Sequence, residues 1–314
     1  MLSVSLVITL SFLVGLVDKS AGEQEIKNIS SINIIMRSGG LTIVATPIGN
    51  LDDISKRAVE ALVMSDFVIC ENPKHSLKLL NKLGIKKKLI SIHDHNEIKV
   101  IKKIENDLNN KKFILISDAG SPLISDPGHK LIKHCINKKI SLTCIPGPTS
   151  VIASLQLSGL SLNNFTYLGF LPKTKKKIID FIKNVENLTT TSVFFVSTHK
   201  LKICLECIEK FMNQRSLSVC KELTKVNEFV FRGTAKQIKE QLYKNDKYMK
   251  GEFVFVVEGN DLKTDKSIDL RNLNNVIEKL LGKFSLTEVV EIVHKLSNIK
   301  RNIIYKWLLD LKNT

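Results

Sequence analysis

Asp118 is the residue whose position indicates chemistry most clearly. It follows an apolar run at 113–117 and precedes Ala119 and Gly120. A carboxylate there can accept hydrogen bonds from hydroxyl or amino groups, and a glycine lets a ligand approach the backbone. This arrangement suits a nucleoside. An Asx-turn or a helix cap uses the same residue types, so the segment alone leaves both interpretations open.

A second group of titratable residues forms the run His-Asp-His-Asn-Glu at 93–97. Histidine titrates near neutral pH and a neighbouring carboxylate raises its pKa, so the run could serve acid–base catalysis. Consecutive side chains at the end of an extended strand point in opposite directions, which argues against chelation of one metal ion. We expect no metal site there.

The sequence lacks the motifs that usually indicate several other functions. Gly39 and Gly40 precede the first predicted strand, and the chain has neither a G-x-G-x-x-G run nor a Walker lysine loop, which argues against NAD and ATP. Cys204 and Cys207 have C-x-x-C spacing but lie within a predicted amphipathic helix. We interpret all six cysteines as reduced core residues rather than disulfide, redox or zinc groups.

The polar segments follow predicted strands. Strands are expected at 41–45, 67–70, 89–92, 113–117 and 141–145, alternating with helices at 54–64, 76–83, 98–108 and 129–137. Strict alternation predicts a parallel sheet with helices on both faces. The ligand site should then lie in the loops beyond the carboxyl ends of the strands.

A second α/β unit is expected from about residue 163. Its predicted strands are 165–168, 192–196, 217–220, 229–232 and 252–258, and its helices are 175–185, 201–211 and 235–243. Some of these strands follow one another without a helix, which predicts a mixed sheet. Three tail helices are expected at 270–281, 286–296 and 301–311. The predicted domains are therefore 39–160 and 161–262, with a helical tail at 268–314.

Residues 1–38 form a leader whose status the sequence leaves open. Residues 2–17 are almost wholly apolar, as in a signal peptide or a short membrane anchor. However, no Lys or Arg precedes them, the run is shorter than the roughly 20 residues of a membrane span, and the following cleavage site is poor. Met36 stands just before the first predicted strand. We expect no membrane partner.

The charge predicts a phosphate-rich partner. The 314 residues include 47 Lys and Arg against 31 Asp and Glu, a net charge of +16. Ordinary values of 43% hydrophobic and 25% charged residues exclude global disorder and a multi-span membrane protein. Lysines cluster at 86–88 and 173–177, which favours nucleic acid over a merely solvated surface. Aromatic residues, at 6%, do not argue for base-stacking platforms.

From about 41 through 259 the chain resembles the tetrapyrrole-methylase superfamily, and within it the small-subunit ribosomal RNA (cytidine-2′-O-)methyltransferases. The motifs that carry the resemblance are TPIGNL at 46–51, HDHNE at 93–97, SDAGSPLISDPG at 117–128, PGP at 146–148, GFLP at 169–172, ELTK at 222–225 and GE at 251–252. The segments at 93–97 and 118–128 are specific to the ribosomal RNA branch.

The resemblance implies a two-domain α/β fold, with a parallel sheet in the N-terminal domain, a mixed sheet in the C-terminal domain, and a tail similar to a helix-turn-helix. It implies S-adenosylmethionine held in the cleft between the domains, a homodimer, a cytoplasmic location, and a decoding-region cytidine of small-subunit RNA, free or in the 30S subunit, as substrate. The residues implied for the cofactor are Pro47, Asp118, Ala119, Gly120, Ser121, Thr149 and Ser150. Those implied for RNA are Lys74, Lys173, Lys175, Lys200 and Lys225.

Two segments depart from the family pattern. Residues 71–75 read ENPKH where the family has EDTRH, and 195–200 read FVSTHK where it has YESxHR. The candidates that remain for a catalytic base are Glu71, Asp94 and His95. Two alternatives stay open: an RNA-binding remnant without catalysis, and a methylase of a tetrapyrrole or another small molecule. The block at 93–97 and the basic charge disfavour the small-molecule alternative.

Overall fold

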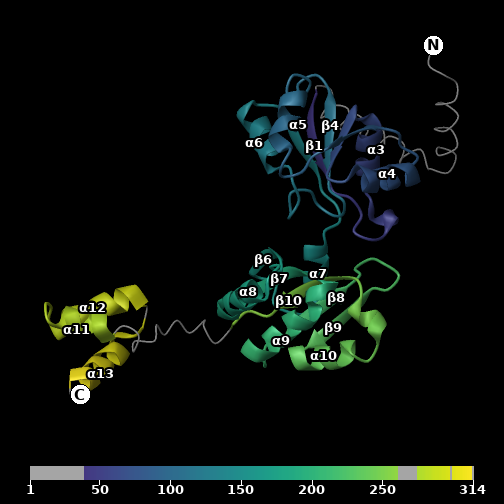
Figure 1. The fold of residues 1–314 in the computed structure, drawn as a ribbon. Coiled ribbons are helices and arrows are strands. Elements are labelled where there is room, and N and C mark those ends of the chain that lie inside the picture. The colour runs from purple at the N-terminus through teal and green to yellow at the C-terminus, as the bar shows by residue number, and fades with distance from the viewer. Residues whose placement is uncertain (1–38, 261–273, 298, 313–314) are drawn as a thin grey trace, which may run out of the picture. The chain divides into compact units, whose positions relative to one another are not determined.

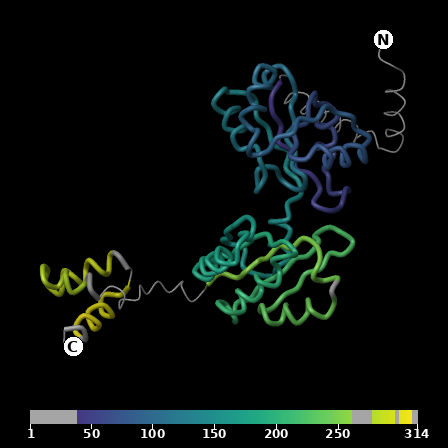
Figure 2. The backbone as a smooth tube through the Cα atoms, viewed as in Figure 1, coloured from purple at the N-terminus to yellow at the C-terminus, as the bar shows by residue number. Residues whose placement is uncertain are grey.

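A computed structural model describes residues 39–260, 274–297 and 299–312, shown as a ribbon in Figure 1 and as a backbone tube in Figure 2. The predicted leader at 1–38 lies outside the described residues. The described residues form two compact units, one reaching to Ala153 and including Leu223–Val226, the other holding the rest. No helix in the described part of the chain is long and apolar enough to cross a bilayer.

The first unit is built on the predicted parallel sheet. Its strands are β1 (Gly40–Val44), β2 (Phe67–Cys70), β3 (Lys88–Ser91), β4 (Lys112–Ile116) and β5 (Leu142–Ile145), in the order β3-β2-β4-β1-β5. Every pairing is parallel. Strand β1 therefore lies between β4 and β5, and the loops that follow these three strands meet at one edge of the sheet.

Helices cover both faces of this sheet, as Figure 1 shows: α3 (Lys56–Met64) and α4 (Pro73–Lys82) on one face, and α5 (Glu97–Ile104) and α6 (His129–Asn137) on the other. Alternation along the strands produces this layering. Val68 and Cys70 belong to the core under α3 and α4, whereas Ile69 belongs to the core under α5 and α6. Both faces are thus apolar, as the unbroken apolar strands predict.

The second unit contains the predicted mixed sheet. Its strands are β6 (Phe165–Phe170), β7 (Thr191–Ser197), β8 (Leu217–Lys221), β9 (Phe229–Gly233) and β10 (Glu252–Val257), in the order β6-β7-β10-β8-β9. Only the β6–β7 pairing is parallel. Helices α8 (Lys175–Asn187), α9 (Leu201–Phe211) and α10 (Ala235–Leu242) share one core with the sheet. Cys204 and Cys207 are buried in α9, and burial raises the pKa of both thiols, which fits core residues.

One helix was not predicted. Helix α7 (Ser150–Ser158) follows the loop after β5. Its buried residues include both a serine, Ser154, and an apolar residue, Leu155. Two further apolar residues, Ile152 and Leu157, are exposed. Because apolar residues occur around most of its circumference, the segment lacks the polar face that reveals an amphipathic helix.

The tail helices are α11 (Asn274–Leu281), α12 (Leu286–Ser297) and α13 (Arg301–Lys312). They have a small core of their own, formed by Ile277, Val289, Val290, Val293, Ile304 and Leu308. Ser285 caps α12, because its Oγ accepts a hydrogen bond from the Glu288 amide at 3.4 Å while the Glu288 carboxylate accepts one from the Ser285 amide at 2.8 Å.

Candidate functional site

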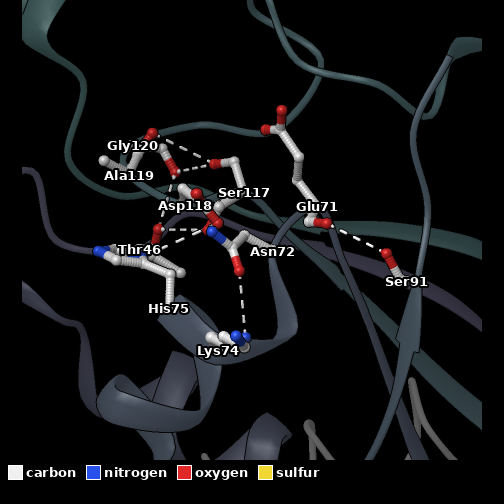
Figure 3. A network of polar contacts seen from close by, with 10 residues as sticks. All are labelled: Thr46, Glu71, Asn72, Lys74, His75, Ser91, Ser117, Asp118, Ala119 and Gly120. Atoms are coloured by element: carbon white, nitrogen blue, oxygen red, sulfur yellow. Dashed lines mark hydrogen bonds and ion pairs between the residues drawn. The ribbon is translucent and has the colours of Figure 1, made fainter.

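The loops after β1 and β4 are joined by a reciprocal pair of backbone hydrogen bonds. Thr46 N–H donates to Gly120 O at 2.9 Å, and Gly120 N–H donates to Thr46 O at 3.0 Å. The Thr46 side chain is fully buried, and its hydroxyl donates to Ser117 O at 3.2 Å (Figure 3). These bonds fix the backbone on both sides of Asp118.

Gly120 lets the β5 loop approach this pair. Its φ is +79°, a conformation that disfavours other residues, and a Cβ there would lie 3.3 Å from Ile48 and 3.7 Å from Pro148 O. Ser121 Oγ donates to the same Pro148 carbonyl at 3.5 Å. The predicted cofactor residues Pro47, Asp118, Ala119, Gly120, Ser121 and Thr149 therefore lie on three adjoining loops, and Ser150 begins α7.

The Asp118 carboxylate is incompletely paired. Its Oδ1 atom is buried and has no hydrogen-bond partner among the described residues. The His75 imidazole lies beside it, with Nδ1 3.8 Å from Oδ1. Helix α4 supplies His75, and Asn72 caps that helix by accepting a hydrogen bond from Lys74 N–H at 3.2 Å (Figure 3). Asn72 and Pro73, two departures from the family pattern, thus make a favourable helix start.

Glu71 and Asp126 lie near Asp118, and Asp94 lies near Glu71. Burial, and then the charge of Glu71, raise the pKa of Asp126 to about 6, against the effect of its hydrogen bond with Ser117. Burial, and then the charges of Asp118 and Asp94, raise the pKa of Glu71. This edge of the sheet therefore carries a negative potential that suits a cationic group. Asp126 was not predicted as a site residue, although it lies in the SDAGSPLISDPG motif at 117–128 that carries the family resemblance.

The run at 93–97 forms a turn, not the extended strand end that we expected. Asn96 builds it: its Oδ1 accepts from His93 N–H at 2.8 Å, and its Nδ2 donates to Ser91 O at 3.1 Å. The rings of His93 and His95 consequently lie edge to face, with centroids 6.1 Å apart. Asp94 and His95 are exposed.

Glu97 is buried, and its carboxylate accepts hydrogen bonds from backbone amides of α6. Its Oε1 accepts hydrogen bonds from the amides of Lys130 and Leu131, at 2.8 and 3.3 Å. These amides belong to the first turn of α6, whose N-cap residue Gly128 offers no side chain. Glu97 therefore caps α6 from a distant part of the sequence.

The lysines predicted to bind RNA have different surroundings. Lys74, Lys173 and Lys175 are exposed. Lys200 instead donates from Nζ to Leu171 O at 2.8 Å. Lys225 belongs to the Leu223–Val226 segment, which packs on the turn at Gly49, where a Cβ would lie only 2.6 Å from Lys225 Cγ. In the same contact, Asn50 N–H donates to Thr224 Oγ1 at 3.0 Å.

The chain is similar to known methylases. Residues 40–239 match the family model described as Tetrapyrrole (Corrin/Porphyrin) Methylases. The chain is 36% identical over 286 residues to ribosomal RNA small subunit methyltransferase I of Buchnera aphidicola subsp. Schizaphis graminum, covering 90% of this chain and 100% of that protein. The protein of that name from Haemophilus influenzae is 35% identical over 276 residues, covering 86% and 96%. A crystal structure of diphthine synthase shares the fold, with a TM-score of 0.53 at 19% identity over 70% of this chain and 89% of that one.

Proposed function

Because the chain belongs to the tetrapyrrole methylase family, we propose that the loops around Asp118 bind S-adenosylmethionine and that the methyl acceptor is a cytidine 2′-oxygen in the decoding region of 16S ribosomal RNA. The chain is an S-adenosylmethionine-dependent methyltransferase of small-subunit ribosomal RNA. The single observation that carries the site assignment is the buried Asp118 oxygen, which has no hydrogen-bond partner among the described residues and lies on a loop held by Thr46.

The residues present fit this cofactor. S-adenosylmethionine carries a sulfonium and an ammonium cation together with ribose hydroxyls, and it supplies an activated methyl group. Asp118 can accept hydrogen bonds from hydroxyl or amino groups, and the neighbouring Glu71 and Asp126 add negative potential. The positive φ of Gly120 lets backbone and ligand come close. We assign Pro47, Ala119, Ser121, Thr149 and Ser150 to the same cofactor site.

The chain's remaining task is to orient the ribose and remove its proton. Holding the attacking oxygen in line with the methyl group can contribute roughly 7 to 11 kcal/mol in favourable cases. Among the candidate bases Glu71, Asp94 and His95, we propose Glu71. Its raised pKa brings its basicity closer to working pH, which favours general base catalysis. Asp94 and His95 would then orient the substrate.

The exposed Lys74, Lys173 and Lys175 are proposed to contact RNA phosphates, together with Lys225. Lys200, in contrast, is engaged with a backbone carbonyl. Exposed Arg301 and Lys306 on α13 support a role for the tail helices in RNA or dimer contacts. A ribosomal substrate favours the cytoplasm as the place of the reaction. The family resemblance favours a homodimer, which sedimentation velocity would test.

The test is methyl transfer from labelled S-adenosylmethionine to purified small ribosomal subunits that lack the modification, followed by nuclease mapping of the labelled ribose. We expect label on one decoding-region cytidine. Naked 16S RNA, assayed in parallel, shows whether the assembled subunit is required. Label on a base or on another nucleotide would contradict the proposed acceptor. Cofactor binding without any label would favour the RNA-binding remnant.

A further inference from the structure

An exposed aromatic cluster lies at the β6 edge of the mixed sheet. It consists of Tyr167, Phe170 and Phe195, with the Phe195 ring between the other two. The ring centroids of Tyr167 and Phe195 are 5.4 Å apart, and those of Phe170 and Phe195 are 5.0 Å apart. Phe170 is 62% exposed, unusually high for so large an apolar side chain. Tyr167 and Phe195 are half-buried, so the three rings together present a partly exposed aromatic face that a ligand can cover.

A β-bulge brings these rings to one face. Tyr167 and Phe170 are three positions apart, so strict strand alternation would place them on opposite faces. The register with β7 shifts between them, and Gly169, with φ of +70°, lies inside the shift. Phe194, the neighbour of Phe195, packs on the opposite, helix-covered face against Phe181. The sequence did not predict this platform because it depends on the bulge.

Hydrogen bonds fix the backbone that follows the exposed Phe170 ring. Leu171 N–H donates to Phe195 O at 2.8 Å, and Leu171 O accepts from Lys200 Nζ, also at 2.8 Å. The Leu171 side chain is itself buried in the core of this unit. Leu171, the residue after Phe170, is thus fixed by its backbone hydrogen bonds and by its buried side chain. The backbone that carries Phe170 therefore needs little ordering when a ligand stacks on the ring.

Positive charge follows the cluster directly. Lys173, Lys175, Lys176 and Lys177 are all exposed and lie within seven residues of Phe170 in the sequence. None of these four lysines forms an ion pair with any described residue. Partly exposed aromatic rings and exposed lysines on neighbouring segments of the chain are the combination that binds single-stranded nucleic acid, with bases stacked on the rings and phosphates near the lysines.

We propose that the Tyr167–Phe170–Phe195 platform stacks an unpaired nucleotide of the RNA substrate, while Lys173 and its neighbours bind the adjoining phosphates. This inference rests on the proposed RNA substrate and adds how the substrate is held. It commits to unpaired RNA because a duplex keeps its bases stacked inside and presents only phosphates and hydroxyls to such a face.

The test compares Phe170→Leu, which removes the ring but stays apolar, with Phe170→Trp, which keeps a ring. The control is Phe165→Leu: Phe165 is 43% exposed on the same strand and stacks on no ring among the described residues. Binding of a short labelled single-stranded oligoribonucleotide and of a matching RNA duplex is measured by anisotropy with the full-length protein. Circular dichroism melting checks that each variant folds.

Phe170→Leu should raise the Kd for the single strand by roughly 5- to 150-fold, as for the loss of one stacked base, and leave the duplex unaffected. Phe170→Trp should restore affinity, and Phe165→Leu should change it less than about twofold. Lys173→Gln should reduce the slope of log K against log salt by about 0.7, the value for one phosphate contact on a single strand.

Three results separate the alternatives. Unchanged single-strand binding by Phe170→Leu, with weakened S-adenosylmethionine binding, would assign the ring to the cofactor and overturn the proposal. Unchanged RNA binding with a smaller sedimentation coefficient would make the face an interface between two copies and also overturn it. Failure of the wild-type protein to methylate small subunits would refute the proposed function, whereas the proposed platform would stand if Phe170→Leu still lost single-strand affinity.

Discussion

Asp118 Oδ1 and His75 Nδ1 lie 3.8 Å apart, joining the end of β4 to the first turn of α4. At that distance the imidazole is a weak partner for the carboxylate, whose Oδ1 is buried and otherwise lacks a hydrogen bond among the described residues. A buried polar atom without a partner is costly unless a ligand satisfies it. Asp118 is therefore placed to accept a hydrogen bond from a donor that residues 39–260 and the described tail helices do not supply.

Asp118→Asn should weaken S-adenosylmethionine binding while preserving RNA binding. A hydrogen bond to a charged group contributes about 1.5 to 3 kcal/mol, so we expect a Kd roughly 10- to 150-fold higher by isothermal titration calorimetry. Asp107→Asn is the matched control, because the Asp107 carboxylate pairs with Lys111 on the surface, at 3.0 Å. Equal affinity of Asp118→Asn and wild type would remove Asp118 from the cofactor site.

The raised pKa of Asp126 predicts a pH-dependent stability. The unfolded chain loses this proton near pH 3.8, and the folded chain retains it to about pH 6. The folded state binds more protons between these values, so the free energy of unfolding falls as pH rises through that window and then levels off. Glu71 shifts in the same direction, so only a comparison of variants isolates Asp126.

Asp126→Asn should therefore be more stable than wild type at pH 7 and equal to it at pH 3.5. Because Asp126 is only half-buried, solvent reduces both the cost of burying its charge and the repulsion from Glu71, and we expect a gain of about 1 kcal/mol. Urea unfolding at the two pH values measures it. Asp180→Asn, which alters an exposed carboxylate on α8, should show no such difference. A gain that persists at pH 3.5 would show that the charge is not its cause.

The Glu97 cap predicts an asymmetry between two substitutions. Glu97→Leu leaves the Lys130 and Leu131 amides without their acceptor and should lower the free energy of unfolding by about 1 to 2 kcal/mol. Glu97→Gln keeps an acceptor oxygen and should cost less than half as much. Thermal and urea unfolding compare them. Equal losses would show that the negative charge, rather than the acceptor, stabilises α6.

The site could be located from the sequence because a parallel sheet leaves little freedom. Once 41–45 and 113–117 are taken as neighbouring parallel strands, Thr46 and Asp118 must emerge at the same edge, and the structure joins Thr46 to Gly120 there. Long-range contacts were not predictable in the same way. Glu97 looks like part of an acid–base run, yet it caps a helix 33 residues away. The bulge at Gly169 likewise reverses the face that alternation assigns to Phe170.

Removing the charge of Lys200 should affect stability, whereas removing the charge of Lys173 should affect RNA binding. Lys200→Met leaves the Leu171 carbonyl without its donor, so we expect a loss of about 1 to 2 kcal/mol of stability. We expect the salt dependence of RNA binding not to change, because the Leu171 carbonyl already holds the Lys200 ammonium in place. Lys173→Gln should instead leave the stability unchanged and weaken the salt dependence of RNA binding. Melting curves and salt titrations of both variants are the measurement, and a salt slope altered by Lys200→Met would return Lys200 to the RNA contacts.

Glu71→Gln should slow methyl transfer much more than it weakens cofactor binding. Removing a general base costs about 10²- to 10⁴-fold, so kcat on small subunits should fall by that factor, while the loss of one neighbouring negative charge should raise the KM for S-adenosylmethionine only slightly. Because the base must be ionised and its pKa is raised, the wild-type rate should rise with pH through that pKa and then level off. Glu206→Gln on α9 is the exposed control. If Asp94→Asn or His95→Ala abolishes this pH dependence while Glu71→Gln keeps it, the base is one of those two residues instead.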